Sequence, residues 1–142
     1  MADPHELRRF VDAQDGVWEG ALHELEAGRK RSHWMWFVFP QARGLGHSAM
    51  SQHYGIGSLE EARAYLAHPL LGPRLVRCTR AAMGCGVGSL GQIFGPPDDA
   101  KFISSMSLFR LAEGEDARGP WQSALDRWND GELDQRTVEL MQ

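Results

Sequence analysis

Residues 28–41 read GRKRSHWMWFVFPQ and gather the side-chain types that bind an anionic ring compound. Cations at the start of the stretch can hold a phosphate group, and tryptophans can stack on a ring. A histidine and an amide add hydrogen-bonding groups. About 60 residues later, an acid and a lysine open another helical pattern. The residues that we predict to bind a ligand are Lys30, Arg31, His33, Trp34, Trp36, Gln41, Asp98 and Lys101.

The same stretch is also typical of a buried core segment. Residues 34–39 are apolar on every face, so most of them must lie inside, where their burial could contribute on the order of 10 kcal/mol. A buried segment would have to satisfy its polar groups internally. Both interpretations stay open from the sequence.

Two catalytic patterns occur without the context that they need. Residues 86–91 match the G-x-G-x-x-G pattern, but an arginine-rich helical pattern precedes them where a dinucleotide fold has a strand. Residues 46–50 resemble a nucleophile elbow around Ser48, but Met50 stands where the second glycine is required. We therefore expect no cofactor. No catalytic residue is assigned, and whether the chain is an enzyme stays open.

Metal ligands and disulfides are not indicated either. None of the six histidines forms a pair four residues apart beside an acid, and neither Cys78 nor Cys85 has a partner at zinc spacing. We expect no metal site, and we expect both cysteines to be reduced structural residues.

The segments that carry these residues are predicted to be helical. Asp3 and Pro4 predict a helix start, and Gly28 is a typical helix end. Whether one kinked helix or two short ones lie between them stays open. Ser58 and Glu61 form a capping box at the start of another helix.

Further helices follow in the second half of the chain. Asp98 is expected to cap the helix that carries Lys101. Before it, a helical segment has arginines three residues apart, and we expect these to line one solvated flank: Arg74, Arg77 and Arg80. No convincing β-alternation occurs. The predicted fold is all-α, a compact single domain over residues 1–142 with about six to eight short helices.

Composition and charge restrict the partners. The chain has 142 residues with 42% hydrophobic and 24% charged residues, which is ordinary for one globular domain. No apolar run is long enough for a bilayer span and no signal peptide is evident, so we expect a cytoplasmic protein without a membrane partner.

The charges are unevenly distributed along the chain. Residues 29–80 carry a net charge of +6, whereas residues 1–28 and 81–142 carry −5 each. The basic middle could attract an anionic small molecule, or the flanks could neutralise it in the fold. The acidic total of −4 argues against duplex nucleic acid as a partner. The oligomeric state is left open.

The motifs as a whole resemble a known family. Residues 28–41 are joined by GLG at 44–46, YGI at 54–56, YLAH at 65–68, LGPRL at 71–75, IFGPPD at 93–98 and KFISSMSLF at 101–109. This set, which spans nearly the whole chain, is similar to domain of unknown function 1810, whose members are bacterial with some in other lineages. The resemblance implies a mainly helical single domain and no established activity. The family often carries the label calpastatin, which has no weight because calpain inhibitors of that name are disordered.

Two hypotheses follow for the function. The first is a site for a phosphate-bearing small molecule, such as a nucleotide or an ADP-ribose-like compound, in a basic and aromatic pocket, with binding alone or with an enzymatic reaction. The alternative is a non-catalytic protein-interaction or regulatory module, in which the same residues are core and helix caps. Solvent access to the predicted residues distinguishes the two.

Overall fold

The structure is a computed structural model that describes residues 3–115 and 118–142. Within these residues the chain forms ten helices: α1 (Arg8–Gln14), α2 (Trp18–Glu26), α3 (Met35–Val38), α4 (Ala49–Tyr54), α5 (Leu59–Ala67), α6 (Leu71–Gly84), α7 (Leu90–Ile93), α8 (Asp98–Glu113), α9 (Trp121–Trp128) and α10 (Gln135–Leu140). The predicted all-α class is confirmed. The number exceeds six to eight because the turns at α3 and α7 each close into a helix of four residues.

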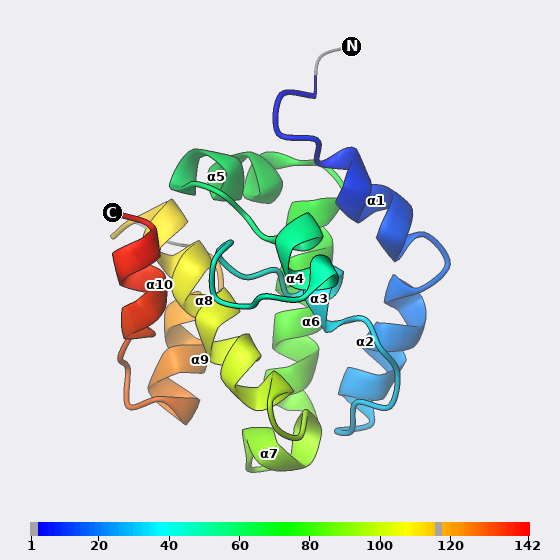
Figure 1. The fold of residues 1–142 in the computed structure, drawn as a ribbon. Coiled ribbons are helices and arrows are strands. Elements are labelled where there is room, and N and C mark those ends of the chain that lie inside the picture. Colours follow the sequence, from blue (N-terminus) through cyan, green and yellow to red (C-terminus); the bar gives the residue numbers. More distant parts are fainter. Residues whose placement is uncertain (1–2, 116–117) are drawn as a thin grey trace.

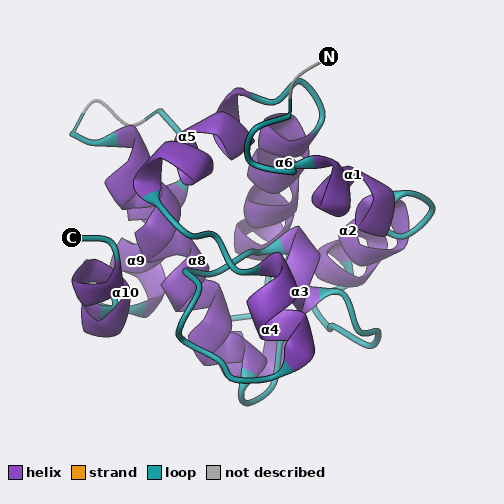
Figure 2. Cartoon of the chain, turned by 45° about the horizontal axis from the view of Figure 1, so that its top comes forward, coloured by secondary structure: helices purple, strands orange, loops and turns teal. Residues whose placement is uncertain are grey.

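The two longest helices, α6 and α8, form the centre of the molecule (Figure 1). Helix α2 packs on α6, and α9 and α10 pack on α8, while α5 contacts both central helices. Helices α1 and α2 lie at one side and α9 and α10 at the other, with α3 and α4 between them (Figure 2). No strand occurs in the described part, but one isolated parallel bridge joins Ala42 to Ile56.

Local hydrogen bonds account for most helix boundaries. The hydroxyls of Ser58 and Ser89 accept the backbone N–H groups of Glu61 and Gln92, as expected for N-caps. Gly28 follows α2 with a φ of +78°, and a Cβ there would meet Val87 Cγ2 at 2.5 Å. Gly28 therefore ends α2 and allows the next segment to turn closely past Val87.

The N-terminal boundary differs from the expectation. The Asp3 carboxylate accepts the N–H groups of Leu7 and Arg8, but Glu6 has a left-handed φ of 51°, so α1 begins at Arg8 and not at Pro4. Two short helices, not one kinked helix, lie before Gly28.

Asp98 and the arginine flank also differ in detail from the prediction. Asp98 is the first residue of α8 and makes no capping hydrogen bond, because Pro97 occupies the cap position. Arg77 and Arg80 are exposed as expected, but Arg74 is half-buried: it lies 4.9 Å from the Trp18 ring centre and donates to Gln14 Oε1.

The core is continuous through the molecule and contains most of residues 34–39. Trp34, Met35, Phe37, Val38 and Phe39 are buried, whereas Trp36 is only partly covered. Phe39 makes edge contacts with Phe94 and Phe102, which ties the segment to α8. Burial raises the pKa of the Cys78 thiol to about 12, so this cysteine stays protonated inside the core.

Candidate functional site

Five of the predicted ligand-binding residues meet in a cluster that we call the Asp98 cluster: Lys30, Trp34, Trp36, Asp98 and Lys101. Asp98 lies at its centre, with its carboxylate 3.0 Å from Lys30 Nζ and 3.6 Å from Lys101 Nζ. Lys30 Nζ lies 5.0 Å from the Trp34 ring centre, and Lys101 Nζ lies 5.6 Å from the Trp36 ring centre. The fold thus joins the two predicted segments although about 60 residues separate them.

The Asp98 cluster is more enclosed than an open binding wall. The side chain of Lys30 is only 8% exposed and also donates to the Ser32 carbonyl at 2.5 Å. Trp34 is 1% exposed. Its indole N–H donates to Glu24 Oε1 at 3.1 Å. Trp34 therefore acts as a core residue, and much of the cluster's charge is used within the cluster.

The remaining three predicted residues lie around this cluster. Gln41 is half-buried and lines the same small hollow as Trp36. His33 and Arg31 are exposed. Arg31 and Lys30, together with Arg29, line a cleft of about 350 Å³, and Lys30 also borders a cleft of about 440 Å³ against residues 91–95.

Glu24 fixes the backbone of this basic segment. Its carboxylate accepts four hydrogen bonds, from the Ser32 hydroxyl, the N–H groups of Arg31 and Ser32, and the Trp34 indole. Desolvation by itself would raise the pKa of Glu24, but these hydrogen bonds outweigh it and lower the pKa to about 2. The segment 29–34 is therefore held by an ionised carboxylate on α2.

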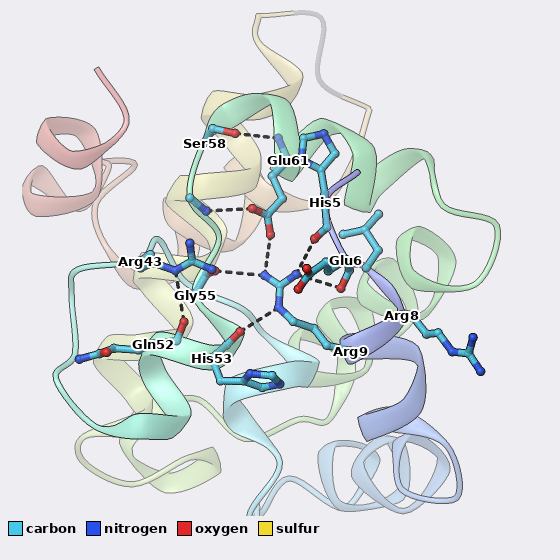
Figure 3. A network of polar contacts seen from close by, with 12 residues as sticks. His5, Glu6, Arg8, Arg9, Arg43, Gln52, His53, Gly55, Ser58 and Glu61 are labelled. Atoms are coloured by element: carbon cyan, nitrogen blue, oxygen red, sulfur yellow. Dashed lines mark hydrogen bonds and ion pairs between the residues drawn. The ribbon is translucent and has the colours of Figure 1, made fainter. Parts of the chain in front are cut away.

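A second group of polar residues, which sequence reasoning missed, forms what we call the polar cleft (Figure 3). The cleft has a volume of about 450 Å³ and is lined by Pro4, His5, Glu6, Arg9, Arg43, Gln52, His53 and Glu61. These residues come from the segment before α1, from α1, from the bridge at Ala42, from α4 and from α5.

One side of the polar cleft is the ion pair between Arg9 and Glu61. Their side chains are 10% and 9% exposed, and Arg9 Nη2 lies 2.6 Å from Glu61 Oε2. The other donors of Arg9 reach the carbonyl oxygens of His5, Glu6, His53 and Gly55. Glu61 also accepts the N–H of Gly57 at 3.1 Å. All five donors of the guanidinium are thus satisfied, and the pair is a rigid base, not a free binding group.

Arg43 differs from Arg9 because its binding capacity is largely unused. The bridge fixes its backbone, since Arg43 N donates to the Ile56 carbonyl at 2.8 Å. Arg43 Nε donates to the Gln52 carbonyl at 3.2 Å. Neither terminal nitrogen of Arg43 has a hydrogen bond or ion pair within residues 3–115 and 118–142. The polar cleft therefore has a positioned guanidinium with four N–H donors available.

Two imidazoles complete the lining of the polar cleft. His5 is half-buried, and His53 is exposed with its ring edge on Tyr54 at a centroid distance of 4.6 Å. An imidazole can accept or donate a hydrogen bond. The lining thus offers two imidazoles beside the Arg43 donors.

The sequence contained only one signal for this cleft, and it pointed elsewhere. Glu61 was assigned to the capping box of Ser58, which predicts that its carboxylate turns back to the helix start. The carboxylate does reach the backbone at Gly57, but its second oxygen binds Arg9, 52 residues earlier.

No metal site accompanies either cluster, because no group of three or more His, Cys, Asp or Glu side chains in the described ranges could hold an ion. No helix in those ranges is both long and apolar enough to cross a bilayer.

Comparison with known proteins identifies the family but no activity. The structure is similar to the crystal structure, at 1.38 Å, of the conserved hypothetical protein Rv1873 from Mycobacterium tuberculosis, with 53% sequence identity over 98% of both chains and a TM-score of 0.93. No curated protein matches the sequence. Residues 4–141 match the family described as protein of unknown function (DUF1810), and the chain therefore belongs to that family.

Proposed function

We propose that the protein binds a small molecule carrying a phosphate group and that the polar cleft is its binding site. The carrying observation is Arg43, whose terminal N–H groups have no partner in the described residues although Nε and the backbone are both held. A guanidinium presents donors in a planar fork that fits two oxygens of a phosphate. Because the side chain is already anchored, little conformational freedom is lost on binding.

The surroundings of Arg43 support a small ligand. The volume of about 450 Å³ lies within the usual range for small-molecule sites. Arg9 and Glu61 neutralise one another, which leaves the Arg43 guanidinium and the Glu6 carboxylate as the other charged groups of the lining. His5 and His53 can add hydrogen bonds to phosphate oxygens or to the rest of the ligand.

The basic segment 29–31 is a second candidate binding site for a phosphate compound. The observation in its favour is that Asp98 and Trp34 hold Lys30 in place, between two clefts that Arg29 also lines. Arg31 and Lys101 could then act as the sequence suggested, although Trp34 is enclosed by the core. The two candidate sites predict different effects of mutations on ligand affinity.

The test is a thermal-shift screen over inorganic phosphate, nucleotides and sugar phosphates, followed by calorimetry on any hit. A ligand at 100 times its Kd should stabilise the fold by about 2.7 kcal/mol. For the polar cleft, Arg43→Gln should weaken the hit at least tenfold. Arg136→Gln, which removes an exposed arginine elsewhere, should leave affinity unchanged.

The same calorimetric titration distinguishes the two candidate binding sites. If Arg29→Gln/Arg31→Gln abolishes binding while Arg43→Gln does not, the ligand sits on the basic segment and the polar cleft is excluded. If none of the phosphate compounds binds the parent protein, the phosphate-ligand proposal fails and the non-catalytic interaction module becomes the leading function.

A further inference from the structure

A further cavity lies where α5, α6 and α9 meet. We call it the arginine groove. Its volume is about 520 Å³, and its lining residues are Leu66, Gly72, Pro73, Val76, Arg77, Arg80, Glu113, Arg118, Gly119 and Trp121. None of these residues belongs to the Asp98 cluster or to the polar cleft.

The floor of the arginine groove is apolar. Leu66, Pro73 and Val76 supply aliphatic surface, and the indole of Trp121 lies beneath them in the core. Trp121 is 1% exposed and its N–H donates to Glu113, so the indole supports the aliphatic floor from below. Gly119 lies directly against this ring, because a Cβ there would meet Trp121 Cε2 at 2.2 Å. An occupant must therefore bury apolar surface.

The rim of the arginine groove is cationic. Arg77 and Arg80 are exposed and stand one helical turn apart on α6, and neither has a hydrogen bond or ion pair within the described part of the chain. The Arg77 guanidinium also lies 5.8 Å from the Trp18 ring centre, which leaves its N–H donors unused. Arg118 also lines the groove. Among the described lining residues Glu113 is the one acid, and its carboxylate accepts the N–H groups of Gly119 and Trp121. The available groups at the rim thus attract an anion.

The size of the apolar surface favours a small molecule over a protein partner. The large exposed hydrophobic residues in the described ranges are Val17, Met50 and Leu70, which belong to three separate segments. A stable protein interface buries a much wider continuous surface than such isolated residues provide. A cavity of about 520 Å³ is instead typical of a site for a small ligand.

We propose that the arginine groove binds a small amphipathic carboxylate. Its alkyl or aryl part lies on Pro73 and Val76, and its carboxylate lies between the guanidinium groups of Arg77 and Arg80. An arginine fork matches the two oxygens of a carboxylate, while the apolar floor excludes small hydrophilic anions. This site is independent of the polar cleft and of its proposed phosphate ligand.

The test compares decanoate with decanol, which has the same chain without the charge. Binding is measured by calorimetry and by the shift of the assigned Trp121 indole N–H signal in an NMR titration. Decanoate should bind at least tenfold more tightly than decanol and should move the Trp121 signal. Equal affinities, or the absence of decanoate binding, would overturn the proposal.

A charge-matched pair of double variants locates the site. Arg77→Gln/Arg80→Gln should weaken decanoate at least tenfold and leave decanol unchanged. The control, Arg8→Gln/Arg136→Gln, removes two exposed arginines elsewhere and should keep parental affinity. If both double variants weaken decanoate equally, the attraction is a general effect of net charge and the arginine groove is not the site. Arg43→Gln should leave decanoate binding unchanged, which separates this result from the phosphate test.

Discussion

At the scale of single residues, Glu24 controls the segment that carries the predicted ligand-binding side chains. Its carboxylate accepts four hydrogen bonds from residues 31, 32 and 34, and these lower its pKa from 4.5 to about 2 despite partial desolvation. A carboxyl group whose pKa is lower in the folded state stabilises the fold above its unfolded pKa. This stability is lost as the pH falls from about 4.5 towards 2.

Glu24→Gln should therefore be less stable than the parent at pH 7, by about 1 kcal/mol, because an amide cannot accept all four hydrogen bonds. The difference should shrink as the pH falls from 4.5 to 2, where the parent carboxylate becomes protonated. Urea unfolding of both proteins across this pH range measures the effect. Glu26→Gln, an exposed neighbour on α2, is the control and should stay close to the parent throughout. A stability difference that does not depend on pH would contradict the assigned role.

At the scale of elements, Arg9 joins four parts of the chain. Its guanidinium links α1 to residues 5 and 6 before it, to residues 53 and 55 at the end of α4, and to Glu61 on α5. Both members of the pair are almost fully covered. Removing one partner of a buried ion pair leaves an uncompensated charge, which is strongly destabilising.

Arg9→Met should lower the free energy of unfolding by roughly 3–5 kcal/mol, as judged from denaturant titration. Arg8→Met is the matched control: Arg8 is 84% exposed and pairs only with Asp12 on the surface, so its loss should cost less than about 1 kcal/mol. Hydrogen exchange should also increase in α1 and α4 of the Arg9 variant. Similar stabilities of the two variants would show that the network does not hold these elements together.

At the scale of the whole molecule, ion pairs and core contacts both connect distant parts of the chain. The Lys30–Asp98 pair joins a cation of the basic middle to an acid of the last part and so neutralises part of the uneven charge along the sequence. The Arg9–Glu61 pair also links the first part to the middle, but it joins the minority charge of each part. Buried residues from α1 to α9 form one continuous cluster around α6 and α8.

A continuous core predicts a single cooperative unfolding transition. Circular dichroism and tryptophan fluorescence should give the same midpoint, and the calorimetric and van't Hoff enthalpies should agree. The five tryptophans are spread over the chain, so fluorescence reports on several parts at once. Two separate transitions would mean that the chain contains two folding units and would contradict the predicted single domain.

The features that depend on neighbouring residues could be predicted from the sequence. The serine cap at Ser58, the helix end at Gly28 and the all-α class follow from spacing and backbone preference, because their hydrogen bonds join residues only a few positions apart. The motifs also identified the family, and the apolar run at 34–39 was correctly expected to be mostly buried.

Which polar groups remain available to a ligand depends on packing between distant segments and could be seen only in the folded chain. Lys30 and Arg43 look alike in sequence as cations near glycines, yet Lys30 is buried against Asp98 while Arg43 keeps its terminal donors open in the polar cleft. Trp34 and Trp36 are two residues apart, but the chain encloses the first and leaves the second partly exposed. The burial of Lys30 depends on Asp98, which is far away in the sequence, and the covering of Trp34 and the availability of Arg43 depend on how the helices close around them. Burial and pairing are properties of that packed arrangement, so no local pattern contains them.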